Sequence, residues 1–235
     1  MSFSLEAHTL PYQILHHWFN TPAGHAVAQA FADELRYLSE TLHGEYLLQF
    51  GSANHNPWLS TLDFKHKWLA SPCIDKTSSV ITAFLELPIN RYQIDCVLAP
   101  LTTEVVVNYQ VLLDEIDRVL KPSGHVVFWG INTYSLWNWG LRKQLWSTVK
   151  CSRVSPLMLK RVFLTRGYRQ CLWREFYFIP PISSKWLIRR LAFLNEMGKL
   201  LWPYPPGFYC LVLQKQVLNL VNPIPISADE RLSFA

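Results

Sequence analysis

Apolar residues follow two patterns along the chain, one periodic and one continuous. They return every three to four residues in segments 21–44 and 108–120, which is the pattern of a helix with one buried face. Thr21 and Pro22 are suited to the start of the first helix, and Gly44 is suited to its end. We therefore predict two amphipathic helices in these segments.

Short continuous apolar runs separate the helices and predict strands. In the first part of the chain they cover residues 46–50, 79–85, 94–99 and 125–130, and we predict a further strand over the poorly patterned segment 65–70. Continuous apolar character is typical of strands that are buried on both faces. The order strand, helix, strand over residues 94–130 predicts a crossover connection, and thus a parallel sheet with helices on both faces.

The pattern is less regular beyond residue 130. The predicted elements are a helix over 155–167, a strand over 171–179, a basic amphipathic helix over 184–201 and a last strand over 208–213. We divide the chain into an N-terminal extension (1–20), a main domain (21–215) and a loosely attached tail (216–235). Within the main domain, residues 134–205 form a basic lid and C-terminal half.

The composition is that of an ordered α/β protein. Half of the 235 residues are hydrophobic and 17% are charged, which allows a large core. The pattern of a signal peptide is missing, as is an apolar run of about 18 residues. The five cysteines show no C-x-x-C spacing, so we expect reduced thiols in a cytoplasmic protein. The histidines lack metal-ligand spacing, so we expect no metal site.

Charge is distributed unevenly. Residues 1–141 contain 7 Lys and Arg against 13 Asp and Glu, whereas residues 142–215 contain 14 against 2. The net charge of +5 therefore combines an acidic first part with a strongly basic second part. A segment this basic predicts an anionic partner, and RNA, a membrane surface and an acidic protein all remain open.

Segment 86–128 carries a longer motif. Leu87 and Pro88 precede a short polar loop, a strand follows with Asp95 and Val97, and a helix ends in the run LLDEIDRVLKPSG. The segment resembles the class I, Rossmann-like S-adenosylmethionine-dependent methyltransferases of type 11. Residues 130–143, GINTYSLWNWGLRK, are similar to a stretch in a glycine-poor bacterial subgroup of these proteins. The resemblance implies a three-layer α/β fold with a seven-stranded, mostly parallel sheet, helices on both faces and an antiparallel last strand.

The resemblance also implies a binding site for S-adenosylmethionine. In the family, a glycine-rich turn follows the first strand, and acids lie at the head of this turn, at the end of the second strand and before the Leu-Pro pair. Here the turn keeps Gly51, while Gln49, Leu69 and Ala83 occupy the acidic positions, so the cofactor motif is degenerate. The implied cofactor-binding residues are Gln49, Gly51, Ser52, Asn54, Leu69, Phe84, Leu85, Glu86, Ala99 and Pro100.

Polar residues after the predicted strands are candidates for catalysis. Glu104 follows the fourth strand and can act as a general base, while Asn132 follows the fifth strand and can bind an acceptor. His55, shortly after the first strand, can reach a ligand carboxylate or a methyl acceptor. A solvated or structural role is the alternative for each of the three.

Other polar and aromatic residues have a structural interpretation. The resemblance implies a scaffold role for Asp95, Glu115 and Arg118. Three tryptophans lie among Arg and Lys residues, namely Trp137, Trp139 and Trp146. They suit a membrane interface or stacked bases, or else they pack on the core.

Two functions remain open from the sequence. The first is an S-adenosylmethionine-dependent methyltransferase that acts on a small or carrier-bound acceptor. The second is a non-catalytic module of the methyltransferase fold that binds an anionic partner through its basic half. A dinucleotide-dependent oxidoreductase is disfavoured because the G-x-G-x-x-G motif is missing.

Overall fold

The computed structural model describes residues 2–216, except for 52–55, 74–77, 83, 85, 107, 146–153 and 202. The helices are α1 (Ser2–Phe19), α2 (Pro22–Arg36), the short 3-10 helix η1 (Pro57–Thr61), α3 (Thr102–Val105), α4 (Tyr109–Val119), α5 (Leu136–Leu145), α6 (Pro156–Thr165), α7 (Lys185–Arg190) and α8 (Phe193–Leu201). The strands are β1 (His43–Phe50), β2 (Asp63–Ser71), β3 (Val80–Ile81), β4 (Ile94–Pro100), β5 (Leu120–Ile131), β6 (Tyr168–Phe176) and β7 (Phe208–Lys215).

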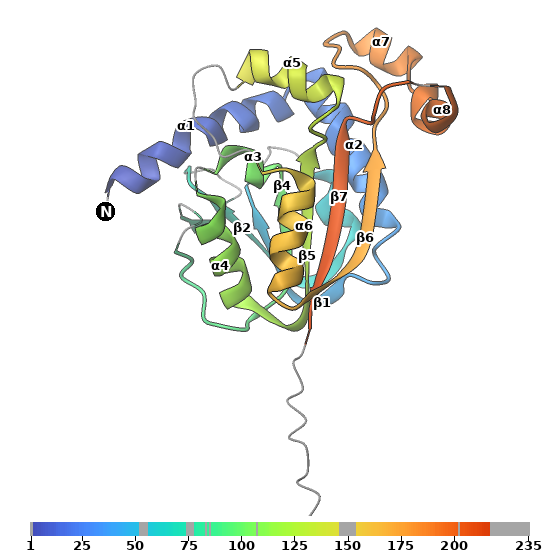
Figure 1. Ribbon diagram of the computed structural model, residues 1–235. Helices are drawn as coiled ribbons and strands as arrows, with labels where there is room; N and C mark the ends of the chain where they lie inside the picture. The colour runs from blue at the N-terminus through green and yellow to red at the C-terminus, as the bar shows by residue number, and fades with distance from the viewer. Residues whose placement is uncertain are drawn as a thin grey trace, which may run out of the picture.

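The seven described strands form one sheet in the order β3-β2-β1-β4-β5-β7-β6 (Figure 1). The pairs from β3 through β5 are all parallel, while β7 runs antiparallel to both β5 and β6. The predicted mostly parallel sheet with an antiparallel last strand is therefore confirmed. Helices cover both faces of the sheet, with α4 and α6 on one and α2 on the other (Figure 1).

The strand register brings several chain segments to one edge of the sheet. Gln49 of β1 pairs with Leu69 of β2 and with Leu98 of β4. On the other side of β4, Pro100 pairs with Trp129 of β5. The carboxyl ends of β1, β2, β4 and β5 therefore meet at one edge, which we call the carboxyl edge, and α1 crosses it (Figure 1). In open α/β sheets this edge is where ligands bind.

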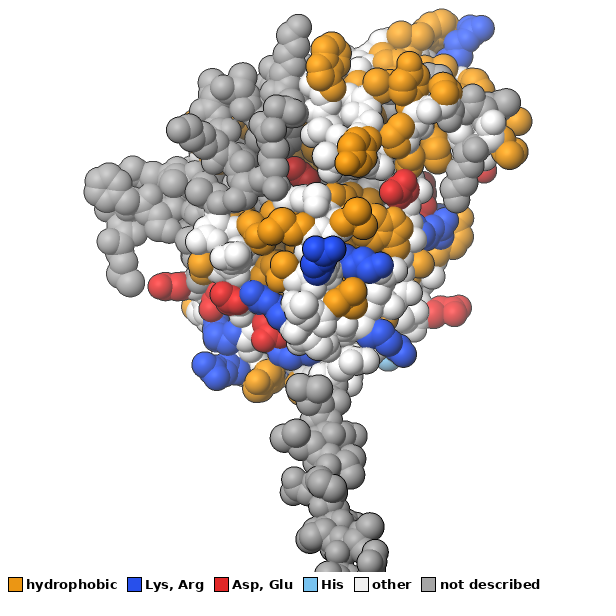
Figure 2. Space-filling model, viewed as in Figure 1, with side chains coloured by type: hydrophobic (Ala, Val, Ile, Leu, Met, Phe, Trp, Pro, Cys, Tyr) orange, Lys and Arg blue, Asp and Glu red, His pale blue; other side chains and the backbone are white. Residues whose placement is uncertain are grey.

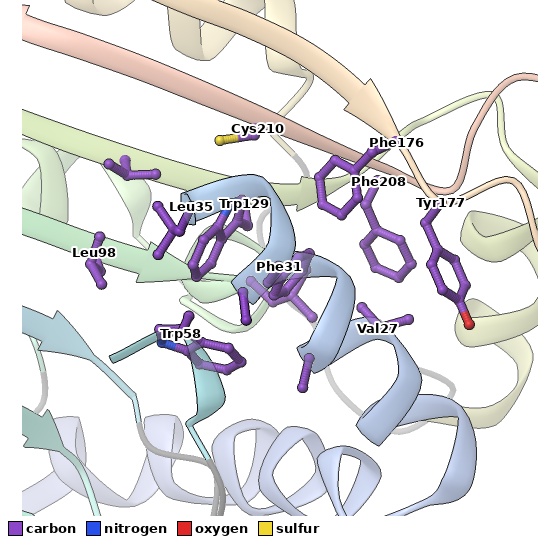
Figure 3. Packing of buried hydrophobic residues seen from close by; sticks show 14 of the residues in the cluster. Val27, Phe31, Leu35, Trp58, Leu98, Trp129, Phe176, Tyr177, Phe208 and Cys210 are labelled. Carbon is purple, nitrogen blue, oxygen red and sulfur yellow. The ribbon is translucent and has the colours of Figure 1, made fainter. Parts of the chain in front are cut away.

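The face covered by α2 is packed with aromatic rings (Figure 3). Phe31 of α2 is stacked on Trp129 of β5, with ring centroids 4.5 Å apart. Trp58 and Phe208 meet Phe31 edge-on, at centroid distances of 5.9 and 5.7 Å. All four side chains are fully buried. Burial of each ring contributes on the order of 1.5–3 kcal/mol, so this cluster is a main source of stability.

The opposite face is covered by α4 and α6. Leu112, Leu113 and Ile116 of α4 are fully buried against the sheet. From α6, Phe163 packs on Phe128 of β5 with ring centroids 5.3 Å apart. The apolar positions of the predicted helix 108–120 are thus the ones that contact the parallel strands.

Helix α2 begins as predicted but ends early. The Thr21 hydroxyl accepts a hydrogen bond from the Gly24 N–H and caps the first turn. The helix ends at Arg36 rather than near Gly44, because the chain continues in turns over residues 37–42. The Ser39 hydroxyl donates to the Arg36 carbonyl there. Leu38 and Leu42 remain buried, so the apolar period of the sequence extends beyond the last residue of the helix.

Two other predicted elements were wrong in extent. The predicted strand 79–85 is reduced to Val80–Ile81, because Phe84 adopts φ +66° and the Thr82 hydroxyl donates to the Glu86 carbonyl, which turns the chain. The predicted helix 184–201 is two helices, α7 and α8, separated at residues 191–192. The break lets Asn195 accept a hydrogen bond from the Phe178 N–H while α8 packs on the core.

The segment that we predicted as an N-terminal extension contains α1. Tyr12, Leu15, Trp18 and Phe19 of this helix are buried among the core residues. The helix therefore contributes to both apolar layers of the main domain. Residues 217–235, most of the predicted tail, lie outside the described part of the chain.

Candidate active site

The turn that follows β1 is held by a buried glutamine. The Gln49 amide nitrogen donates to the Gly51 carbonyl at 2.7 Å and to Asn56 Oδ1 at 3.0 Å. The Gln49 amide oxygen accepts from the Trp58 indole N–H at 2.8 Å. Both ends of the amide are therefore used to join the turn to η1. This geometry explains why a glutamine rather than an acid occupies the position, since the carbonyl oxygen of Gly51 needs a donor.

Gly51 is the point where the chain leaves β1. Its φ of +82° lies in the left-handed region that favours glycine, and its N–H donates to the Ala70 carbonyl at 2.7 Å. A Cβ added at Gly51 would lie 2.9 Å from Cε2 of Tyr12 in α1. The ring of Tyr12 thus lies directly against the turn.

An aromatic cluster continues from Tyr12 along the carboxyl edge. The ring of Phe84 lies edge-on to Tyr12 at 6.1 Å and to Phe50 at 5.2 Å between centroids. All three rings are buried. The sequence did not point to Tyr12, because it lies in the segment predicted as an extension and only the fold brings it to Gly51.

The end of β2 lacks the carboxylate that the family resemblance implies. Leu69 is buried, and its N–H donates to the Ser79 hydroxyl. The Ser71 hydroxyl accepts from the Cys73 N–H. Among the described residues from Ser71 to Pro88, Glu86 is the one carboxylate; its side chain is exposed, and its carbonyl accepts a hydrogen bond from the Thr82 hydroxyl just after β3.

The carboxyl edge brings most of the predicted cofactor-binding residues together. Gln49, Gly51 and Leu69 lie at the ends of the paired strands β1 and β2, and Ala99 and Pro100 end the neighbouring strand β4. Phe84 joins them through its ring contact with Phe50. Four further predicted residues, Ser52, Asn54, His55 and Leu85, lie outside the described residues, as does Ala83.

Glu104 and Asn132, the other two candidates for catalysis, form hydrogen bonds within the fold. Glu104 of α3 accepts a hydrogen bond from the Ile131 N–H at 3.3 Å. Asn132 accepts from the Tyr134 N–H through its side chain, and its backbone N–H donates to the Gly207 carbonyl. These contacts connect α3 to the end of β5 and shape the turn into α5.

A pocket of about 520 Å³ lies beside the α1–α2 junction. Trp18 of α1 and Trp137 of α5 form part of its wall, with ring centroids 6.1 Å apart. The Trp137 indole N–H donates to the Ile179 carbonyl at 2.7 Å, so its ring is fixed. Leu141, Pro181 and other largely apolar residues complete the lining. An aromatic and apolar lining suits the apolar part of a small molecule.

The three tryptophans of the basic region differ in their surroundings. Trp137 is buried and also packs on Phe208 and Tyr177, so its ring belongs to the core. Trp139 is exposed on α5, and Trp146 lies outside the described residues.

The residues interpreted as scaffold form a bonded cluster at the opposite, amino edge of the sheet. Arg118 forms a two-point ion pair with Glu115, and its guanidinium also donates to the carbonyls of Leu87 and Ile89. Glu115 accepts in turn from the Leu87 N–H. The interpretation as scaffold is confirmed, since these bonds fix the Leu-Pro loop onto α4.

Asp95 joins three strands near the same edge. Its carboxylate accepts from the backbone N–H groups of Glu45 and Tyr46 in β1 and forms a 2.7 Å ion pair with Lys121 in β5. Burial works to raise the pKa of Asp95, but the hydrogen bonds from Lys121 and the backbone outweigh it and lower the pKa below its ordinary value.

Among the described residues, no cluster of three or more His, Cys, Asp and Glu side chains is arranged to hold a metal. None of the described helices is long and apolar enough to cross a membrane. The four described cysteines are free thiols.

Residues 59–128 match the sequence model of a family described as Methyltransferase domain. The strand order and the antiparallel β7 fit the same family's fold. The chain therefore has the methyltransferase fold, and its segment 59–128 resembles the class I methyltransferases of type 11. No curated protein matches the sequence.

Solved structures of methyltransferases share the fold. An S-adenosylmethionine-dependent methyltransferase from Archaeoglobus fulgidus is 17% identical, with a TM-score of 0.54 over 80% of this chain and 94% of that chain. A possible histamine N-methyltransferase from Thermotoga maritima is 14% identical, with a TM-score of 0.58 over 87% and 100%. A geranyl diphosphate C-methyltransferase from Streptomyces coelicolor, solved with S-adenosyl-L-homocysteine, is 14% identical, with a TM-score of 0.56 over 82% and 80%.

The segment that matches the family model coincides with the scaffold of the fold. Residues 59–128 contain β2 through most of β5, including Asp95, Glu115 and Arg118. Gln49, Gly51 and Tyr12 precede it. The family likeness is thus strongest where strands and helices are fixed, and the turn at the cofactor position departs from it.

Proposed function

We propose that the protein transfers a methyl group from S-adenosylmethionine to a small or carrier-bound acceptor at the carboxyl edge. The observation that carries this proposal is the left-handed turn at Gly51, at the end of the inner strand β1 in a sheet of methyltransferase order. The φ of +82°, which favours glycine, turns the chain out of β1 at the carboxyl edge, where ligands bind in open α/β sheets. S-adenosylmethionine, when bound, supplies a methyl group activated on a sulfonium sulfur.

The residues fit the cofactor in part. Gly51 fits the methionine end, with the ring of Tyr12 as an apolar wall next to it. The amide of Gln49 is consumed by bonds within the turn. We assign the ribose or adenine contact to Glu86, since an exposed carboxylate after β3 can accept the hydrogen bonds that the acids of the family accept.

The acceptor is proposed to have an apolar part that enters the pocket between Trp18 and Trp137. Methyl transfer needs mainly alignment of donor and acceptor, so fixed walls contribute more than a strong base. Glu104, Asn132 and His55 remain the proposed polar groups around the acceptor. Glu104 is bonded to the end of β5 and Asn132 to the turn before α5, and these bonds favour a role in positioning over proton transfer.

Isothermal titration with S-adenosylmethionine and S-adenosylhomocysteine tests this proposal. We expect saturable binding of both, and in Glu86→Gln an affinity lower by about tenfold, because a charge-assisted hydrogen bond becomes a neutral one. Glu40→Gln is the matched control, since Glu40 is also exposed but lies before β1 at the amino edge. Equal affinities in the two variants would remove Glu86 from the site.

The second candidate is a non-catalytic module, and the crowded carboxyl edge favours it. Tyr12, Phe84 and the bonded Gln49 already occupy this edge. The same titration separates the candidates. If millimolar cofactor produces no heat of binding and no shift in the unfolding temperature, the non-catalytic module is favoured and the proposal of methyl transfer ends.

Whichever candidate holds, we propose that the basic residues of segment 142–215 contact an anionic partner in the cytoplasm. The 14 Lys and Arg against 2 acids in this segment support the contact, and the free thiols support the location. Heparin-column retention that falls with salt would test the charge contact.

A further inference from the structure

Helix α8 has an apolar stripe that the described residues do not cover. Phe193, Met197 and Leu200 are 51%, 44% and 86% exposed. Their spacing of four and three residues places them on one face of the helix. Scattered exposed apolar residues are common on proteins, but three on one short helix face form a patch.

A different face of α8 packs on the core. Leu194 is buried, and a Cβ at Gly198 would overlap the ring of Phe178, so these residues form the contact with the domain. At about 100° per residue, the stripe lies roughly a third of a turn from this contact. The apolar arc of α8 is therefore wider than the domain needs for its own packing.

Helix α7 adds an exposed tryptophan and cations. Trp186 is 63% exposed, and the Arg190 guanidinium lies 5.3 Å from its ring centroid. Arg189, three residues after Trp186, shares this face, and Lys185 is also exposed. Ile188 is buried against the domain. Figure 2 shows hydrophobic side chains gathered over α7 and α8, with Lys and Arg near the margin.

We propose that α7 and α8 together bind the surface of an anionic lipid bilayer. The combination of Trp, Phe, Leu and Met with Lys and Arg matches the layered chemistry of that surface, where apolar side chains enter the acyl boundary and cations meet headgroup phosphates. RNA is the weaker fit, because aliphatic side chains such as Leu200 offer no ring on which a base can stack.

The position of the two helices in the fold suits this role. They lie in the connection between β6 and β7 and project from the end of the molecule at which the carboxyl edge lies (Figure 1). Residues 181–183, which precede α7, line the Trp18–Trp137 pocket. A bilayer bound by α7 and α8 would therefore lie next to the pocket proposed for the acceptor. The inference rests on the proposed anionic contact and is independent of cofactor binding.

Flotation of the full chain with vesicles tests the apolar stripe. We expect binding to vesicles of equal parts phosphatidylglycerol and phosphatidylcholine, and in Leu200→Glu a partition coefficient lower by about tenfold, because a charge replaces an inserted side chain. Leu157→Glu is the matched control, since Leu157 is 69% exposed on the distant helix α6. Equal loss in both variants, or none in either, would overturn the inference.

The charged residues are tested in parallel. Arg189→Glu/Arg190→Glu should abolish binding to the anionic vesicles, while Arg161→Glu on α6 should weaken it only slightly. Because all these side chains are exposed, unchanged unfolding temperatures are expected. Binding of single-stranded RNA without vesicle binding would overturn the lipid inference and leave the anionic contact standing. A dimer that Leu200→Glu dissociates, without vesicle binding, would overturn it in favour of self-association.

Discussion

The two edges of the sheet are built with opposite chemistry. At the amino edge, carboxylates and cations bind one another and the backbone, as Asp95 does with Lys121 and β1 and as Arg118 does with Glu115 and the Leu87 carbonyl. At the carboxyl edge, aromatic rings and an internally bonded glutamine occupy the corresponding space. The amino edge thus defines the fold, and the carboxyl edge is where this chain departs from the family that it resembles.

The comparison also shows what a family motif reports. The matched residues 59–128 include the polar network of the amino edge. They do not include Gly51 or Tyr12. Conserving a fold requires the bonds that hold loops to helices, whereas the residues at the ligand edge can change without loss of the sheet.

The largest effect is expected where the amino edge is broken. Arg118→Ala should lower the free energy of unfolding by about 2–3 kcal/mol, because the partly buried Glu115 carboxylate loses its ion pair and the carbonyls of Leu87 and Ile89 lose the guanidinium donor. Arg36→Ala removes an exposed ion pair of similar spacing with Asp33 and should change it by less than about 0.5 kcal/mol. Urea unfolding measures both. Equal changes would mean that the network contributes nothing to stability.

The next effect separates backbone strain from ring contact at the carboxyl edge. Gly51→Ala and Gly167→Ala each place a side chain at a φ near +80°, which costs about 1–2 kcal/mol. At Gly51 the new Cβ also meets Tyr12, whereas at Gly167 nothing lies within 4 Å. Gly51→Ala should therefore destabilise the protein more.

A double-mutant cycle sharpens this result. In a Tyr12→Ala background, Gly51→Ala should cost no more than Gly167→Ala does in the native chain, because only the backbone strain remains. Thermal unfolding gives both differences. An unchanged excess in that background would show that Tyr12 is not the residue in contact.

The smallest effect is the acid response of the amino edge. The folded-state pKa of Asp95 lies below the ordinary value of 3.8, so its bonds stabilise the protein fully above pH 4 and lose this contribution as the pH falls below that value. Asp95→Asn should lower stability at pH 7 by about 1 kcal/mol and should flatten the loss below pH 4. Urea midpoints between pH 7 and pH 2 measure this, with exposed Asp33→Asn as the control. If stability declines in parallel in the native protein, Asp95→Asn and Asp33→Asn, then Asp95 is not a source of the acid response.

Periodicity in the sequence was sufficient for most of the fold. The apolar run 94–99 predicted the strand β4, and the helical period of apolar residues over 108–120 predicted the helix α4. Periodicity failed where an element ended. Leu38 and Leu42 stay buried in turns beyond α2. The basic stretch 184–201 divides at residues 191–192, and Asn195 after the break accepts a hydrogen bond from the Phe178 N–H.

The candidate site was less predictable because it depends on contacts between distant segments. Gly51 could be placed at the end of a strand from the sequence, but its contact with Tyr12 joins residues about forty positions apart through the path of α1. The bonds that use the Gln49 amide likewise depend on where η1 brings Asn56 and Trp58. Local pattern carries no information on such meetings.

The position of β7 has a consequence for synthesis. This strand is the last described along the chain, yet it lies between β5 and β6. Until residues 208–215 emerge from the ribosome, both neighbours present unpaired N–H and C=O groups along their lengths. A nascent polypeptide that stalls before that point would hold two open strand edges and tend to aggregate, so holdase chaperones should engage it late in translation.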